Sequence, residues 1–387
     1  MYVLLIFAVV AVLAGICLCS KKSINRQIVY LISLTVVCFF CLRFHLGTDL
    51  SNYYYAFNRV SSPIADAFKY TAQRNIGFNM LLYYGKALLK TYPMFVLLVN
   101  ILCFGLIGWT SYQHSRNLLF SLAVLVSGGV LEVYISSGIR QAISMSVFFF
   151  AFYTFLPKRK YGWYFCFALI ALLFHEAAVF TLFIPLIAKL IPYIRRQWKT
   201  TIAITAGVVA AAFFLFYFIL PAYAARIESM TASIPLRHIL NYFEVTPSIS
   251  LIGMAMELCF LAMTVLFWQL SDCDKKDDFE LLQLLVIAFS VALYLGLSGI
   301  PIISRASDFL QITFLIFLPE LLDQIPDTKR KLLCYVAVIA VHTVLLGVDL
   351  KEKCRHITLL NGETCTIETY PYFTVFDSQA GLYLEKS

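Results

Sequence analysis

Apolar segments recur along the whole chain and are separated by short polar connections. Most of them hold about 15 to 22 residues, and roughly 18 apolar residues in a helix cross the hydrocarbon core of a bilayer. The alternation of lumen and lipid positions that marks a membrane β-barrel is absent. We therefore predict an all-α, polytopic membrane protein with helical spans at 2–19, 27–44, 93–112, 118–135, 141–156, 201–220, 248–270, 280–298, 305–323 and 332–349.

The stretch 161–191 is too long for one span and is interrupted by His175 and Glu176. Basic residues flank it on both sides, at 158–160 and at 195–199. Because basic connections favour the cytoplasmic side, both ends of the stretch are expected inside. The stretch is therefore predicted to be a hairpin of two short helices, with His175 at its outer turn.

Residues 77–92 show a different pattern. Asn79, Tyr83, Lys86 and Lys90 recur at spacings of four, three and four, which gives a helix one polar face. Such a helix lies on the membrane surface or re-enters the membrane, and it does not span. A full span here would move most later basic clusters to the outer side, so we exclude it.

Together these elements give about 12 spans with both chain ends outside, an arrangement that keeps short basic connections inside. The inner basic clusters are Lys21, Lys22 and Arg26; Arg116; Lys158 to Lys160; Arg195, Arg196 and Lys199; Lys275 and Lys276; and Lys329 to Lys331. The outer face receives loops at 45–92 and 221–247 and the tail from 350. The prediction is one transmembrane domain over residues 1–387.

Composition supports this assignment. With 61% hydrophobic and 13% charged residues, the chain has little room for a soluble domain. Its net charge of +8 lies in clusters between spans, so it does not indicate a nucleic-acid partner. No basic region precedes 2–19, which is predicted to be a first span and not a cleaved signal peptide. No metal site is predicted from the 11 cysteines, most of which lie within apolar segments, and an outer compartment permits, without requiring, a disulfide between Cys354 and Cys365.

Two arginines stand where predicted helices begin. Arg140 precedes the segment 141–156 and Arg305 opens the segment 305–323, and both helices are predicted to run inward from the outer face. A helix N-terminus carries partial positive charge, so a cation there needs a negative partner. Guanidinium groups and helix N-termini both bind phosphate, which makes an anionic ligand the natural partner.

Structural roles for these charges stay open as well. Arg140 and Arg305 can also snorkel to the interface, or pair with an acid such as Glu132 or Asp308. Asp308 lies one turn after Arg305, which favours a structural ion pair. Arg43 ends an outward-running helix, where the dipole favours a cation, so snorkelling accounts for it better.

Three further groups are candidates for chemistry. Asp49 follows Gly47, which permits a tight turn beside the membrane, and the aromatic residues after it suit sugar rings. Asp49 fits a helix N-cap equally well. His175 and Glu176 interrupt an apolar segment, where ionisable groups cost roughly 2.5–3.5 kcal/mol unless they face a cavity or a partner. Histidine is a common general base near neutral pH, whereas a polar turn at the water interface is the alternative.

Several short motifs stand in a fixed order over roughly residues 40–325 and in one late pair. They are Gly47-Thr48-Asp49 with Tyr53, Gly77-Phe78, Gly138-Ile139-Arg140-Gln141, Phe174-His175 with Ala177-Ala178, Arg305 with Phe309 and Pro319, and Pro371-Tyr372. In this order the chain resembles the EpsG-like branch of the Wzy-type polysaccharide polymerases. Asn75 stands where members of that family often carry an acid, and Ser144 stands where alanine is usual.

The resemblance implies a GT-C-like membrane glycosyltransferase in a bacterial cytoplasmic membrane, with its active site on the outer face. Such enzymes join oligosaccharide repeat units carried on polyprenyl diphosphate, and they are not expected to need a nucleotide sugar, a metal or another cofactor. A chain-length regulator and a flippase are candidate partners. The absence of a DxD-type pair from the predicted outer loops agrees with this expectation.

The resulting hypothesis is polymerisation of an O-antigen, capsule or exopolysaccharide. The predicted catalytic residues are His175, Asp49, Arg140 and Arg305. The predicted substrate contacts are Gln141, Glu176, Tyr53, Tyr54, Arg43 and Asp308. A flippase or transporter of lipid-linked glycans is the alternative, as is a ligase or acyltransferase at the same outer site. A transporter predicts polar residues along the whole membrane path, whereas here they cluster at one end.

Overall fold

The computed structural model describes residues 2–19, 26–42, 50–60, 75–127, 138–197, 251–271, 277–297, 301–355, 364–366 and 368. The predicted span 201–220, the outer loop 221–247 and the residues Asp49, Arg43 and Glu132 lie outside these ranges. Backbone contacts divide the chain into two compact units, Met1–Glu176 with Phe314–Ser387, and Ala177–Thr313. The sequence shows no composition shift at either boundary.

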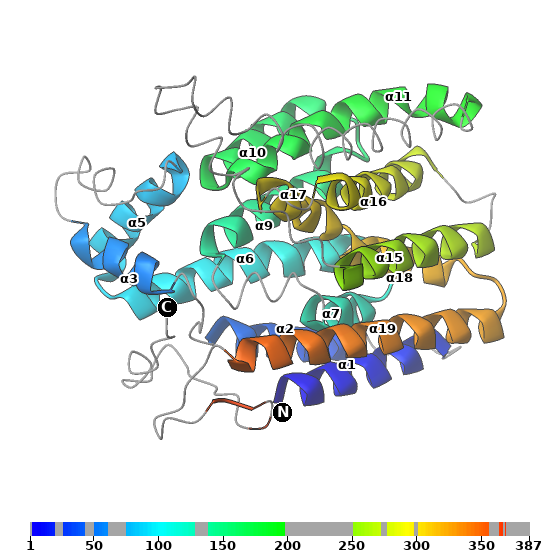
Figure 1. Cartoon of the computed structure of the whole chain (residues 1–387), viewed down its shortest axis with the longest axis horizontal. Helices are drawn as coiled ribbons and strands as arrows, with labels where there is room; N and C mark the ends of the chain where they lie inside the picture. The colour runs from blue at the N-terminus through cyan, green and yellow to red at the C-terminus, as the bar shows by residue number, and fades with distance from the viewer. Residues whose placement is uncertain are drawn as a thin grey trace. The chain divides into compact units, whose positions relative to one another are not determined.

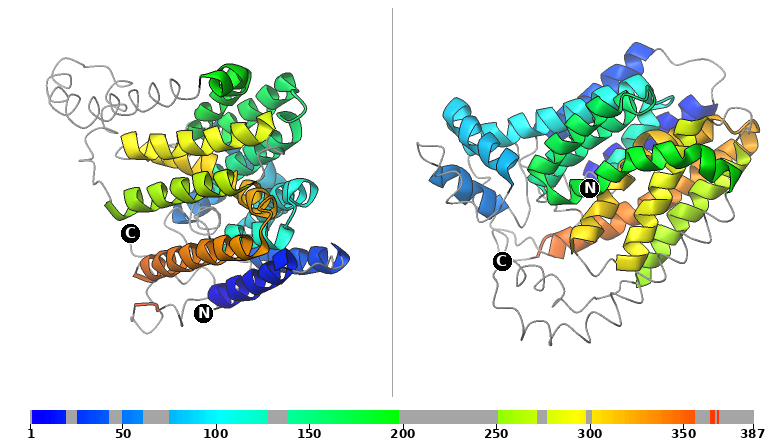
Figure 2. Two further views of the ribbon diagram at one scale, coloured as in Figure 1. Left: turned by 90° about the vertical axis from the view of Figure 1, so that its right-hand side faces the viewer. Right: turned by 90° about the horizontal axis from the view of Figure 1, so that it is seen from above.

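The first unit is a bundle of apolar helices whose centre is α9. Its helices are α1 (Tyr2–Cys19), α2 (Arg26–Leu42), α6 (Tyr92–His114), α7 (Leu118–Ser127), α9 (Ile139–Phe155), α10 (Tyr161–Phe174), α18 (Phe314–Asp323) and α19 (Thr328–Arg355). Helix α9 packs on α6 and α10, α2 packs on α6 and α7, and α1 packs on α7 and α19 (Figures 1 and 2). Almost every side chain of α9 is buried, including the polar ones of Arg140, Gln141 and Ser144.

Among the described residues, five helical stretches are long and apolar enough to cross a membrane: Tyr92–His114, Glu176–Arg196, Gly253–Leu270, Asp278–Leu295 and Thr328–Val348. Shorter apolar helices stand at further predicted spans, at Tyr2–Leu18, Gln27–Leu42, Leu118–Ser127, Ile139–Phe155 and Tyr161–Phe174. The chain is therefore an all-α membrane protein, and the total of about 12 spans stays a prediction.

Two short helices of the first unit, α3 (Leu50–Arg59) and α5 (Ile76–Leu89), pack on each other at the end of the bundle where α6 begins (Figure 1). Helix α5 stands where the sequence predicts a non-spanning helix. Its polar face points inward, however: Asn79 is buried, and the ammonium group of Lys86 donates to the carbonyls of Asn58 at 2.6 Å and Val60 at 2.5 Å.

These carbonyls belong to the last turn of α3 and to the residue that follows it, where a cation complements the helix dipole. The exposed side of α5 is apolar instead and carries Ile76, Met80, Tyr84 and Leu88. The polar spacing in the sequence therefore marks a side of α5 that meets α3, where the lysine finds its acceptors.

Glycines allow α5 to approach its neighbours closely. A Cβ atom on Gly77 would lie 2.9 Å from the carbonyl oxygen of Leu173, near the end of α10. A Cβ atom on Gly85 would lie 2.5 Å from the ring of Phe95 on α6. The Gly77-Phe78 motif thus has a packing explanation, since any side chain at position 77 would push α5 away from the end of α10.

The second unit contains η1 (Glu176–Phe183, whose first residue belongs to the first unit), α11 (Ile184–Arg196), α15 (Leu251–Leu270), α16 (Asp278–Leu297) and α17 (Pro301–Gln311). Helix α16 packs on α11, α15 and α17, and Arg195 forms an ion pair with Asp278 at 3.3 Å. The predicted interruption at His175 is confirmed, because α10 ends at Phe174 and a 3₁₀ helix begins at Glu176.

The predicted single helix at 305–323 is wrong. Helix α17 starts at Pro301 and ends at Gln311, and α18 starts at Phe314. The Thr313 hydroxyl donates to the Leu310 carbonyl at 2.8 Å, a local bond that competes with continuation of the helix. Proline suits a first helical position because its missing N–H needs no partner there, so Arg305 falls in the second turn and not at the helix start.

We predict that Gly77→Ala lowers the stability of the protein. The added methyl group meets backbone and not a flexible side chain, and such overpacking typically costs about 1–3 kcal/mol. Thermal unfolding of the purified protein in mild detergent measures the effect. The control is Gly162→Ala, where a Cβ atom meets nothing within 4 Å. Equal melting temperatures for Gly77→Ala and the wild type would show that the close approach is not required.

Candidate functional site

Arg140 lies in the first turn of α9, as the sequence predicts. The helix begins at Ile139, and its N-cap residue, Gly138, makes no side-chain cap hydrogen bond. The first backbone N–H groups of such a helix lack intrahelical acceptors, and the dipole adds partial positive charge. Only 9% of the Arg140 surface is exposed, so a buried cation sits at the positive end of the helix.

One protein hydrogen bond fixes the orientation of this guanidinium group. Arg140 Nε donates to the hydroxyl oxygen of Tyr53 at 3.2 Å, and the guanidinium carbon lies 6.0 Å from the centre of the tyrosine ring. Tyr53 is 3% exposed, and its ring packs edge-on against Phe78 at 5.1 Å. Helices α3, α5 and α9 therefore meet at this arginine.

The terminal amino groups of Arg140 have no protein partner among the described residues. Within the described residues, the Arg140 side chain makes one hydrogen bond, from Nε. It takes part in no ion pair with an N–O distance up to 4.0 Å there. The amide nitrogen of Gln141, the next residue, is also buried without a hydrogen bond in this part of the chain. Buried N–H donors that lack acceptors favour binding of an anion.

Glu176 supplies a negative charge that interacts with Arg140. Its carboxylate interacts electrostatically with His175 and with Arg140, and it accepts a hydrogen bond from the side-chain amide of Asn75 at 3.3 Å. Asn75 is the N-cap residue of α5, so this bond joins the start of α5 to the residue after the α10 break. An aspartate at position 75 would place a second carboxylate against Glu176, whereas the amide donates to it.

His175 is held by its backbone at the end of α10. It is the C-cap residue, with extended backbone geometry, and its N–H donates to the Ala171 carbonyl at 3.1 Å. The same carbonyl accepts a bond of 2.6 Å from the Ser144 hydroxyl of α9. Ser144 lies one turn after Arg140, so this buried bond fixes the position of the α10 end relative to the helix that carries the arginine.

Four of the predicted site residues therefore lie together in the first unit: Arg140, His175, Glu176 and Tyr53. Gln141 follows Arg140 in the sequence. Tyr54 is 50% exposed on α3, whereas Tyr53 is covered by protein and presents no open ring face for a sugar. Asn75 is a site residue that the sequence did not single out as such. The sequence feature that could have identified Asn75 is its amide side chain, at a position where members of the family that the chain resembles often carry an acid.

Arg305 and Asp308 belong to α17 of the second unit, where Arg305 is exposed and Asp308 is partly exposed. Their predicted convergence with Arg140 stays a prediction. The same unit contains a polar cluster that the sequence did not reveal. Gln311 donates to the carboxylate of Glu257 at 2.7 Å and to the Ser307 hydroxyl at 3.2 Å.

The described residues contain neither a metal site nor a disulfide. No group of three or more His, Cys, Asp and Glu residues could hold a metal ion in this part of the chain. Cys354 and Cys365 are both buried thiols and form no disulfide. Burial, together with the neighbouring Cys365 thiol, raises the pKa of Cys354 to about 11, which lowers its reactivity at neutral pH.

Comparison with known families gives one match. A family model described as the EpsG family matches residues 2–373, nearly the whole chain. Neither the curated proteins nor the solved structures gave a match.

We predict that Ser144→Ala weakens the attachment of the α10 end to α9. Loss of a buried hydrogen bond costs about 1 kcal/mol, so the melting temperature should fall and amide exchange at His175 should accelerate. Thr110→Val is the control, because the Thr110 hydroxyl bonds only the Leu106 carbonyl of its own helix, at 2.7 Å. Unchanged exchange at His175 in Ser144→Ala would contradict the role of this bond.

Proposed function

The chain belongs to the EpsG family, and from this membership we propose that it is a membrane glycosyltransferase that polymerises oligosaccharide repeat units. The units are carried on a polyprenyl diphosphate, and the product is a surface polysaccharide of the O-antigen, capsule or exopolysaccharide type. The reaction takes place on the outer face of a bacterial cytoplasmic membrane, at the end of the first unit where α9 begins. Lipid-linked donor and acceptor are the substrates.

The observation that carries this proposal is the state of Arg140. Its Nε is occupied by Tyr53, its terminal amino groups lack a partner among the described residues, and α9 begins beside it without a side-chain cap. A diphosphate supplies several oxygen acceptors and the negative charge that this positive site needs. The same groups stabilise the charge that grows on the diphosphate as it leaves the sugar.

The reaction needs one proton acceptor. The acceptor hydroxyl attacks the anomeric carbon of the donor, the bond from that carbon to the diphosphate oxygen breaks, and a general base takes the hydroxyl proton. His175 or Asp49 is the proposed base. For His175, the carboxylate of Glu176 is near enough to interact with the ring and to stabilise the imidazolium that forms.

Sugar contacts are proposed for Gln141 and Tyr54. Gln141 offers a buried amide nitrogen without a partner among the described residues, and Tyr54 offers an exposed ring. Tyr53 is reassigned from a sugar contact to the residue that orients Arg140. Arg305 stays a proposed catalytic residue and Asp308 and Arg43 stay proposed substrate contacts, and the proposal for the first unit does not depend on them.

A lipid-linked glycan flippase, or a ligase or acyltransferase, is the alternative. Reconstitution with a purified lipid-linked repeat unit separates these functions. Polymer formed without a nucleotide sugar supports a polymerase, whereas substrate that only changes leaflet supports a flippase. Transfer to a different acceptor supports a ligase.

We predict that Arg140→Ala abolishes long polymer. Removal of a group that stabilises a developing negative charge typically lowers a rate about 10²- to 10³-fold. Arg140→Lys keeps the charge without the planar fork and should fall between Arg140→Ala and the wild type. The measurement is polymer length on a gel at matched protein levels.

Arg116→Ala is the control for this experiment. Arg116 is half-exposed and pairs with Asp323 at 3.4 Å, so its loss should cost little. Wild-type polymer from Arg140→Ala, with normal protein levels, would remove the proposed role.

We also predict that Tyr53 acts through Arg140. Tyr53→Phe keeps the ring and removes the acceptor of the Nε hydrogen bond, so the polymerisation rate should fall about 3- to 10-fold. Lysine has no equivalent of Nε, so Tyr53→Phe should have no further effect in an Arg140→Lys background. Tyr92→Phe, in the same aromatic cluster, is the control. Additive effects of the two substitutions would show that Tyr53 does not orient Arg140.

A further inference from the structure

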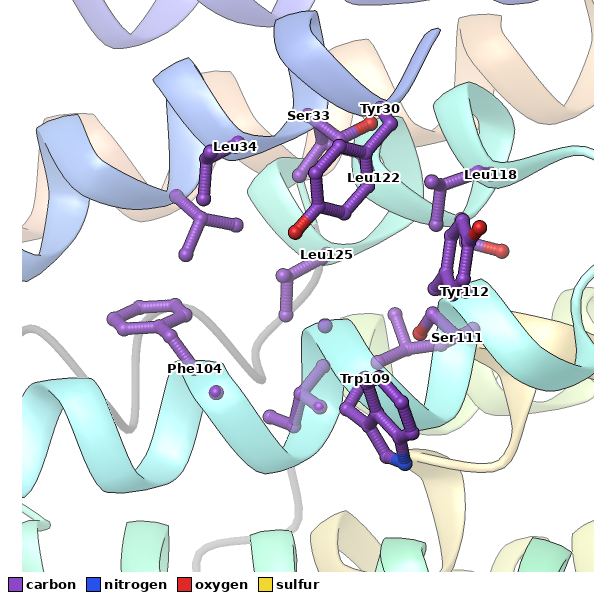
Figure 3. Close-up of a pocket in the computed structure, with 16 residues that line it drawn as sticks. Tyr30, Ser33, Leu34, Phe104, Trp109, Ser111, Tyr112, Leu118, Leu122 and Leu125 are labelled. Atoms are coloured by element: carbon purple, nitrogen blue, oxygen red, sulfur yellow. The ribbon is translucent and has the colours of Figure 1, made fainter. Parts of the chain in front are cut away.

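A cavity of about 440 Å³ lies within the first unit, among α2, α6 and α7, with Leu315 of α18 at its wall (Figure 3). Its lining residues come from stretches well separated in sequence, and none of them is charged. A water molecule takes up only about 30 Å³ of liquid, so a cavity of this size is far larger than a site for one bridging water. An empty apolar space would leave its lining without dispersion contacts.

Along α2, α6 and α7, the residues that line the cavity change from apolar to hydroxyl-bearing toward the same end of the cavity. Leu34, Phe104 and Leu125 form the apolar part (Figure 3). Hydroxyl groups stand at the other part, where α2 and α7 begin and α6 ends, and they belong to Tyr30, Ser33, Ser111, Tyr112 and Ser121. The cavity is therefore amphiphilic, with hydrogen-bonding groups at one end only.

Ser33 points to a ligand at the polar end. Its side chain is 8% exposed and lines the cavity, and its hydroxyl oxygen has no hydrogen-bond partner among the described residues. A buried hydroxyl without a partner costs about 1–3 kcal/mol in proteins, and an acceptor on a bound molecule would remove that cost.

The cavity reaches the lipid-facing surface of the bundle at this polar end. Tyr30 is 47% exposed and Trp109 is 58% exposed. The ring of Tyr112 packs against both, with centroids 5.3 Å from Tyr30 and 6.4 Å from Trp109. Tyrosine and tryptophan gather at the level of lipid headgroups, so these rings mark where the cavity meets the membrane interface.

We infer that this cavity binds one phospholipid of the adjacent leaflet. One hydrocarbon chain lies along the apolar part, and an ester or phosphate oxygen accepts a hydrogen bond from Ser33 near Tyr30 and Tyr112. The polarity of the lining fits this occupant, because its hydroxyl groups can donate to a lipid headgroup while the apolar part favours hydrocarbon.

The orientation of the cavity separates this lipid from the proposed substrate. The Arg140 site lies near the start of α6, where Tyr92 packs on Phe57 of α3 at 5.6 Å. Trp109 stands about 26 Å further along the same helix. A lipid whose diphosphate binds Arg140 would bring only the apolar end of its tail toward Ser33. That end has no atom that could accept a hydrogen bond from the hydroxyl groups of the cavity.

Glycines provide a direct test. Gly105 and Gly108 line the cavity, and a Cβ atom at either position meets nothing within 4 Å, so a larger side chain can start there without a clash of its Cβ atom, and leucine is the substitution chosen to fill the space. Gly347→Leu is the matched control, because position 347 is equally open but does not line the cavity.

The experiment measures the lipid that stays bound to the purified full-length protein in mild detergent, by native mass spectrometry and lipid extraction. The wild type and Gly347→Leu should retain about one phospholipid per chain, and Gly105→Leu and Gly108→Leu should lose at least four-fifths of it. Ser33→Ala barely changes the fold, and it should weaken binding of added phospholipid about threefold to tenfold.

Two results would overturn the inference. One is equal phospholipid retention by the wild type and both leucine variants. The other is a polyprenyl lipid, and no phospholipid, as the molecule that the leucine substitutions remove.

Discussion

The site of the first unit depends on a buried cation held at the positive end of a helix. Arg140 lies in the first turn of α9, where the helix dipole disfavours it, and burial adds a desolvation cost. Tyr53 accepts one hydrogen bond from its Nε, and Glu176 interacts with it over a longer range. Within the described residues, Tyr53 and Glu176 compensate the positive charge of Arg140 only in part. This is the physical basis for assigning an anionic ligand to the site.

The surrounding packing keeps these groups in place. Gly77 lets α5 approach the end of α10, and from that position Asn75 reaches Glu176. Ser144 joins α9 to the carbonyl that also receives the N–H of His175. Interhelical hydrogen bonds from small polar side chains are one way in which membrane helices associate, so stability and site geometry depend on the same contacts here.

Apolar periodicity and charge predicted most of the described apolar helices, the interruption at His175 and the position of Arg140, because these follow from local sequence. They did not predict the break between α17 and α18, at which the Thr313 hydroxyl bonds the Leu310 carbonyl. The burial of Tyr53 and the inward polar face of α5 also escaped prediction, since both result from contacts between segments far apart in the chain. Spacing of polar residues shows that a helix has a polar face, and only its neighbours decide whether that face meets water or protein.

The central claim is that the terminal amino groups of Arg140 bind the diphosphate. Titration of polyprenyl diphosphate into the purified wild type and the Arg140→Ala variant, both in lipid nanodiscs, tests this claim most directly. Loss of a charge-assisted hydrogen-bonding group predicts a Kd at least tenfold higher for the variant. An unchanged Kd in a correctly folded variant would contradict the account.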